Sequence, residues 1–114
     1  MTHEEKALQY FTSGANCAQA VVLAFHDELG MDEKTAARLA SSFGGGIGRL
    51  REVCGAVSGM MMVYGLLRGY DDLKNPDAKK QHYENVQALA NAFREENGSI
   101  ICRELLAGVK TTPG

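Results

Sequence analysis

The 114-residue sequence contains no tryptophan, and aromatic residues make up only 7% of it. A core with so few large rings must be filled mainly by alanine, valine, leucine and methionine. Because small side chains let two helices approach closely, this composition favours a helical bundle over a β-sandwich. No repeat, low-complexity tract or proline-rich linker divides the chain, and its length suits a single domain over residues 1–114.

The sequence also lacks a basic segment. Its 12 lysines and arginines are outnumbered by 14 acidic residues, which gives a formal net charge of -2. Nucleic-acid-binding domains normally carry clustered basic residues on one face. We therefore expect no nucleic acid among the partners of this protein.

Long hydrophobic runs are absent as well. The longest apolar run, residues 60–67, is interrupted by Gly65 and is far too short to cross a bilayer. Residues 1–6 include two glutamates and no apolar segment of the kind found in signal peptides. These absences predict a cytoplasmic protein with no direct membrane span.

The three cysteines, Cys17, Cys54 and Cys102, include no Cys-x-x-Cys pair, and the sequence has no motif for covalent haem attachment. An odd number of widely spaced cysteines also argues against a secreted disulfide scaffold. On composition alone, such cysteines are most simply small buried hydrophobic residues. A chemical role for them has to come from their positions in the fold.

Hydrophobic periodicity and capping residues predict an all-α fold, a compact bundle of about five to six helices around a buried central helix. The expected helices cover residues 4–12, 17–29, 33–43, 52–67, 76–96 and 99–106. Nothing in the sequence predicts a strand. The segment 52–67 is apolar on nearly every side, so we expect it to be the central and most buried helix.

Several residues predict where these helices begin, end and touch. Asn16 and Asp32 are expected N-caps, because their side-chain oxygens accept hydrogen bonds from the first turn of a helix. Gly30 is the expected end of the second helix. Gly55 and Gly59 lie four residues apart on one helix face, so we expect another backbone to pack closely against them.

All three cysteines lie near the start of a predicted helix. Unpaired N–H groups and the positive end of the helix dipole stabilise a thiolate at this position, which is one setting of reactive cysteines. If the three helix starts converge, Cys17, Cys54 and Cys102 form either a redox centre or a metal site. If they do not, each cysteine is core filler.

A glycine-rich segment, residues 44–49, precedes the second cysteine. It lacks the Gly-Lys-Ser/Thr of a P-loop and follows no predicted strand, so we interpret it as a tight loop between closely packed helices. Arg49 and Arg51 stand just before Cys54 in the sequence; either their positive charges stabilise its thiolate or they are solvated surface residues.

Four segments of the sequence resemble, in the same order, the motifs of one family. They are Asn16-Cys17-Ala18-Gln19-Ala20, Phe43-Gly44-Gly45-Gly46, Cys54-Gly55-Ala56-Val57-Ser58-Gly59 and Cys102-Arg103-Glu104-Leu105-Leu106. Over most of its length the chain is similar to the C_GCAxxG_C_C family of redox-active proteins. The resemblance implies four characteristic cysteines, of which Cys17, Cys54 and Cys102 take three; no cysteine follows Cys102 in this sequence. It also implies a redox or transporter-associated protein partner, and a homodimer stays open.

We therefore expect a thiol-based redox protein in which Cys54 is the reactive thiol and Cys17 or Cys102 is its resolving partner. Two alternatives remain open. The first is a non-catalytic protein that holds a metal or an iron–sulfur centre through Cys17, Cys54 and Cys102. The second is a structural interaction partner with inert cysteines.

Overall fold

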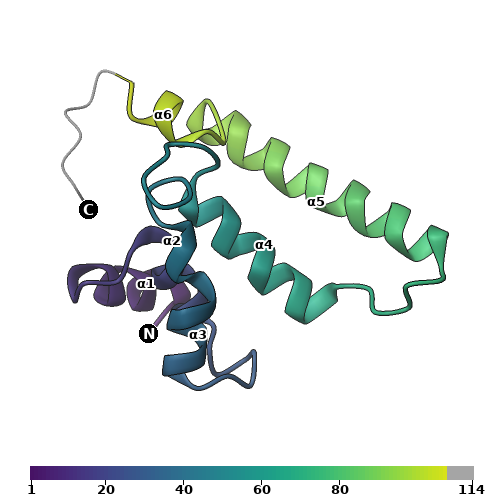
Figure 1. The fold of residues 1–114 in the computed structure, drawn as a ribbon, viewed down its shortest axis with the longest axis horizontal. Coiled ribbons are helices and arrows are strands. Elements are labelled where there is room, and N and C mark those ends of the chain that lie inside the picture. The colour runs from purple at the N-terminus through teal and green to yellow at the C-terminus, as the bar shows by residue number, and fades with distance from the viewer. Residues whose placement is uncertain (108–114) are drawn as a thin grey trace.

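The computed structural model describes residues 1–107, and over this range the chain forms six α-helices and one short 3-10 turn (Figure 1). The elements are α1 (His3–Thr12), α2 (Cys17–Ala24), α3 (Glu33–Ala40), the 3-10 turn η1 (Ser41–Phe43), α4 (Gly55–Arg68), α5 (Pro76–Asn97) and α6 (Cys102–Leu105). Within the described residues there is no strand, only an isolated antiparallel bridge between Val53 and Ile101. The predicted all-α fold is confirmed.

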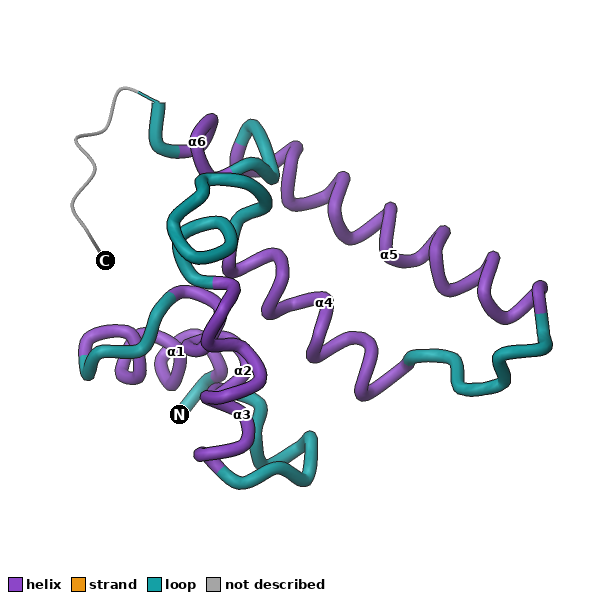
Figure 2. The backbone as a smooth tube through the Cα atoms, viewed as in Figure 1, coloured by secondary structure: helices purple, strands orange, loops and turns teal. Residues whose placement is uncertain are grey.

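The helices form two groups. Helices α1, α2 and α3 pack together at one end of the molecule, and α4 and α5 run side by side as a long hairpin that extends away from them (Figure 2). The loop after Phe43 and the short helix α6 lie at the base of this hairpin (Figure 1). None of the helices in residues 1–107 is both long enough and apolar enough to cross a membrane.

The predicted helix starts at Asn16 and Asp32 are confirmed. The Asn16 side chain accepts a hydrogen bond from the Gln19 N–H at 2.8 Å, and the Gln19 side chain accepts one from the Asn16 N–H at 3.0 Å. This reciprocal capping box fixes the first turn of α2. Asp32 caps α3 with a single hydrogen bond, which its side chain accepts from the Thr35 N–H at 2.8 Å.

Helix α2 ends at Ala24, five residues before the predicted end at residue 29. His26 explains this difference, because its Nδ1 hydrogen-bonds the Met31 carbonyl at 3.0 Å and closes the connection to α3 as a series of turns. Gly30 adopts a φ of 67° within these turns. The glycine therefore shapes the connection between α2 and α3 and does not end α2 itself.

The most buried helix is α2, and the prediction that segment 52–67 would be the most buried is wrong. Five of the eight α2 residues are buried: Ala18, Ala20, Val22, Leu23 and Ala24. Only four of the 14 residues of α4 are buried, and Leu66 and Leu67 near its end are 53% and 49% exposed. The reason is position: α2 packs against α1, α3 and α4, whereas the later part of α4 projects beyond this core beside α5 (Figure 1).

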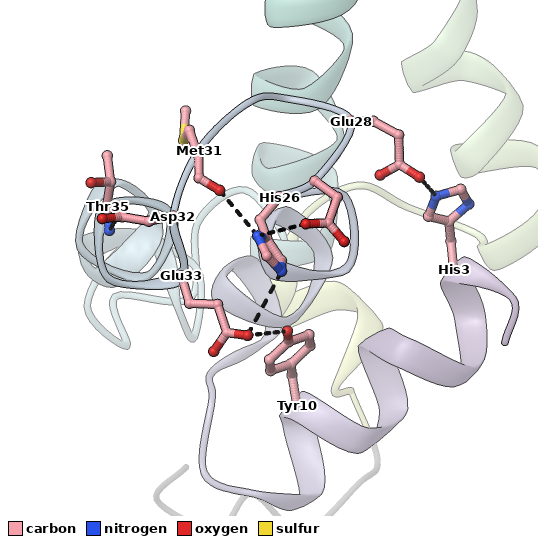
Figure 3. Close-up of polar contacts among 9 residues, drawn as sticks. His3, Tyr10, His26, Glu28, Met31, Asp32, Glu33 and Thr35 are labelled. Carbon is pink, nitrogen blue, oxygen red and sulfur yellow. Dashed lines mark hydrogen bonds and ion pairs between the residues drawn. The ribbon is translucent and has the colours of Figure 1, made fainter.

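Polar contacts fasten the helices around the core to one another, as Figure 3 shows. Tyr10 of α1 donates a hydrogen bond to Glu33 of α3 at 3.1 Å, and His26 Nε2 lies 3.7 Å from the same carboxylate oxygen. Burial, followed by the contact with Glu33, raises the pKa of the Tyr10 hydroxyl. His3 pairs with Glu28 at 2.9 Å, and this hydrogen bond lowers the pKa of the Glu28 carboxyl.

Candidate functional site

Cys17 is the first residue of α2 and is half-buried. The Asn16 side chain that caps this helix also donates a hydrogen bond to the Ser41 carbonyl at 3.1 Å, which ties the start of α2 to η1. A Cβ at Gly44 would overlap the Asn16 side chain, so only glycine fits there. These contacts hold the start of α2 against the beginning of the glycine-rich loop.

Helix α2 lies directly on α4 at the two glycines picked out from the sequence. A Cβ at Gly55 would overlap the Cys17 sulfur and would lie 2.9 Å from the Phe43 carbonyl oxygen. A Cβ at Gly59 would lie 2.9 Å from the carbonyl oxygen of Ala18. The predicted close backbone approach is confirmed, and it places the Cys17 sulfur against the residue that follows Cys54.

Cys54 occupies the N-cap position of α4 and is half-buried. Its N–H donates to the Ile100 carbonyl at 2.8 Å, and its carbonyl accepts from the Ser58 N–H at 3.0 Å. Among the described residues its side chain makes no capping hydrogen bond. The backbone of Cys54 is therefore fixed, while its thiol is not used to stabilise the helix.

Cys102 is the first residue of α6 and is 9% exposed, which makes it the most buried of the three cysteines. Its N–H donates to the Glu52 carbonyl, and its Cβ lies so close to Gly46 that a side chain at Gly46 would collide with it. Arg51 Nη1 donates to the Cys102 sulfur at 3.8 Å. The sequence placed Arg51 beside Cys54, but in the structure its guanidinium reaches Cys102.

Arg49, the other arginine assigned to Cys54, is also placed elsewhere. It lines a shallow pocket of about 300 Å³ together with Asn16, Ser41, Gly44 and Gly48. This pocket borders the residue that precedes Cys17. The structure thus gives Arg51 a contact with Cys102 and Arg49 a place at this pocket, and the positive end of α4 is the local electrostatic feature at Cys54.

The glycine-rich segment is a left-handed turn. Residues 45–49 all have φ between 52° and 73°, and Arg51 has a φ of 63°. This conformation costs a residue with a Cβ roughly 1–2 kcal/mol, and Ile47, Arg49 and Arg51 all adopt it. Hydrogen bonds between backbone groups of the loop offset the strain, among them Arg51 N–H to the Gly45 carbonyl at 3.1 Å.

The far side of this loop is fastened to α6. The Arg103 N–H and guanidinium both donate to the Arg51 carbonyl, at 3.1 and 3.3 Å, and Arg103 also pairs with Glu52 at 3.0 Å. The Val53–Ile101 bridge continues the same pairing, so the segments that carry Cys54 and Cys102 run antiparallel beside each other. The interpretation of residues 44–49 as a tight loop between packed segments agrees with this arrangement.

The cysteines thus lie at three helix starts that one loop and one bridge connect. The Cys17 sulfur packs against Gly55, the residue after Cys54. The Val53–Ile101 bridge joins the segment of Cys102 to the segment of Cys54. In the part of the chain that the structure describes, no three His, Cys, Asp or Glu side chains are grouped as ligands for a metal ion.

These features define a class: small all-α proteins with cysteines at helix starts around a strained glycine loop. The family described as Putative redox-active protein (C_GCAxxG_C_C) matches residues 15–113, and the chain belongs to this family. No curated protein and no solved structure matches the chain. The family membership confirms the resemblance seen in the motifs and gives redox activity as the general description.

Two features of the site were missed from the sequence. One is the Arg51–Cys102 contact, which depends on the left-handed backbone of Arg51. The other is the Val53–Ile101 bridge, which joins residues that are far apart in the chain. The clustering of four glycines in segment 44–49 was the available signal for the first, and the sequence carries no signal for the second.

Proposed function

We propose that the protein is a dithiol redox protein that reduces a disulfide in another molecule, with Cys54 as the attacking thiol and Cys17 as the resolving thiol. The observation that carries this proposal is the packing of the Cys17 sulfur against Gly55, directly after Cys54. Both cysteines are half-buried, so a reagent has partial access to them, whereas Cys102 is buried.

The helix geometry supports thiolate chemistry at this pair. Cys17 is the first residue of α2, and Cys54 immediately precedes the first residue of α4. The unpaired N–H groups at a helix start favour negative charge, and the thiolate is the form of cysteine that attacks a disulfide. Both proposed reacting sulfurs therefore belong to residues at adjoining helix starts.

The proposed reaction has two exchange steps. The Cys54 thiolate attacks one sulfur of a substrate disulfide, which forms a mixed disulfide and releases the other substrate sulfur as a thiolate. The Cys17 thiolate then attacks the Cys54 sulfur, which forms a Cys17–Cys54 disulfide and releases the second substrate thiolate. Two electrons pass from the protein to the substrate, and an external dithiol reductant reverses the change in the protein.

Disulfide mapping tests this assignment. The reduced protein is mixed with oxidised glutathione, quenched with acid and N-ethylmaleimide, and digested with trypsin, which separates the three cysteines into different peptides. We expect peptides 7–34 and 52–68 to be joined through Cys17 and Cys54. Cys17→Ser should leave glutathione on Cys54, and the control Cys102→Ser should leave the pairing unchanged. A pair that includes Cys102, or no internal disulfide, contradicts the proposal.

A further inference from the structure

An apolar groove runs along α4 beside the cysteine site. It has a volume of about 370 Å³ and is lined by Phe43, Val53, Val57, Ser58, Met61 and Met62. None of these six described lining residues carries a charge, and five of them are apolar. Its volume lies at the small end of the range for small-molecule sites, so it suits one compact group and not an extended chain.

The groove adjoins the segment that carries Cys54, because Val53 is one of its lining residues. Val53 directly precedes Cys54, and Ser58 and Met61 follow it by four and seven residues. Residues with this spacing share one face of a helix. A group attached to a sulfur that reacts with Cys54 therefore has an apolar surface ahead of it along α4.

The walls of the groove combine a fixed part and an adaptable part. Val57 is 2% exposed and forms a rigid floor, while Phe43 and Met62 pack against the central core. Met61 is half-buried. Methionine side chains are flexible and polarisable, which suits a surface that accommodates apolar groups of differing shape.

On the basis of the proposed function, we infer that this groove selects the substrate of Cys54: a small disulfide that carries an uncharged aliphatic or aromatic group next to the reacting sulfur. Burying that group releases it from water. A carboxylate in the same place would lose its hydration without gaining a partner. The groove therefore acts on specificity, and the exchange chemistry stays with the cysteines.

N-alkylmaleimides of increasing chain length probe the groove directly, because the maleimide reacts with the thiol while its alkyl group reports on the adjoining surface. We expect the rate of Cys54 alkylation in the reduced wild-type protein to rise about tenfold from N-ethyl to N-hexyl maleimide, since each buried methylene contributes. Cys17 in the same sample is the internal control and should show a weaker dependence. Rates are read by mass spectrometry of the tryptic peptides.

Two substitutions on α4 locate the effect. Met61→Lys places a charge in the groove and should remove the dependence on chain length, while Leu67→Lys on the exposed end of the same helix should preserve it. Circular dichroism checks that both variants fold. Disulfide reagents give a second test. Neutral 4,4′-dithiodipyridine should react faster with the wild-type protein than with Met61→Lys. For the dianionic 5,5′-dithiobis(2-nitrobenzoate), this ratio of wild-type to variant rate should be smaller.

The outcomes separate this inference from the proposed function. If Cys54 reacts readily but at the same rate with every chain length, the groove inference is overturned and the role of Cys54 stands. If Cys54 reacts with none of the maleimides, both are overturned. If the chain-length effect disappears as protein concentration rises, a second copy of the chain occupies the groove, and this too overturns the inference.

Discussion

Arg51 donates a hydrogen bond to the sulfur of Cys102 across 3.8 Å while its own backbone is held at a φ of 63°. The same residue therefore bears conformational strain and covers a cysteine. Replacing Arg51 with glycine relieves the strain but also removes the side chain that covers Cys102. The same replacement at a strained residue that does not contact a sulfur shows the effect of strain alone.

The first prediction concerns the left-handed loop. Ile47 has a φ of 67° and is 41% exposed, so Ile47→Gly should raise the free energy of unfolding by about 1 kcal/mol, through loss of strain. Arg51→Gly relieves the same kind of strain but uncovers Cys102, so it should speed the reaction of Cys102 with iodoacetamide. Urea unfolding and peptide mass spectrometry measure the two effects. A loss of stability in Ile47→Gly would contradict the assignment of strain.

The second prediction concerns the contact between α2 and α4. Gly55→Ala forces a methyl group against the Cys17 sulfur and the Phe43 carbonyl, and should lower the free energy of unfolding by about 1–3 kcal/mol. It should also slow formation of the Cys17–Cys54 disulfide, because the two helix starts must move apart. Both effects are measured by urea unfolding and by the disulfide mapping described above.

Gly65 supplies the matched control on the same helix. A Cβ there meets no described atom within 4 Å, so Gly65→Ala should raise stability by about 1 kcal/mol through helix propensity alone. Equal effects of the two substitutions would show that Gly55 is not a contact point.

The third prediction is an order of thiol reactivity. Near neutral pH and without chelator, iodoacetamide should alkylate Cys54 first, then Cys17, whose sulfur is partly covered by Gly55, and Cys102 last. A difference of about tenfold between Cys54 and Cys102 is expected from their different accessibility.

The same measurement distinguishes the alternatives to a redox function. Uniformly slow alkylation that a chelator accelerates would favour a bound metal or iron–sulfur centre, because removal of the ion exposes the thiolates. Slow alkylation that only denaturant relieves would identify the cysteines as buried and inert.

The fourth prediction concerns acid. Hydrogen bonds from the Thr35 side chain and backbone hold the pKa of the Asp32 carboxyl below its ordinary value, and the hydrogen bond to His3 does the same for Glu28. A carboxyl with a lowered pKa in the folded state contributes stability above its unfolded pKa, near 4, and loses it as pH falls further. Urea unfolding between pH 7 and pH 3 should therefore show stability falling below about pH 4.

Asp32→Asn tests the origin of this acid sensitivity. Asparagine is also a good N-cap, so the variant should fold with α3 intact and should show a smaller loss of stability in acid. An unchanged pH profile would mean that Asp32 contributes nothing to it.

The sequence was most informative where the physics is local. A cap such as Asn16 acts within three residues of itself, and the spacing of Gly55 and Gly59 follows from the helix repeat. The positions of all three cysteines at helix starts followed from such signals. The start of α2 and a close backbone approach at Gly55 and Gly59 could therefore be predicted without coordinates.

The errors arose where the answer depends on distant segments. The segment 52–67 is apolar on nearly every side, yet burial depends on how many neighbours surround a helix, and α2 has α1, α3 and α4 around it. The partner of Arg51 was missed for a related reason. Its guanidinium points to Cys102 because a left-handed backbone and the pairing with α6 direct it there, and neither is visible as a pattern.

The hairpin also has a consequence for local unfolding. None of the residues of α5, all of which the structure describes, is fully buried, so its amide hydrogens should exchange with solvent faster than those of α2. Residues 100–103 are nevertheless held to residues 51–54 by their own backbone hydrogen bonds. Transient opening of α5 therefore leaves the cysteine-bearing segments in register, and the slowest-exchanging amides should lie in α2 and at this junction.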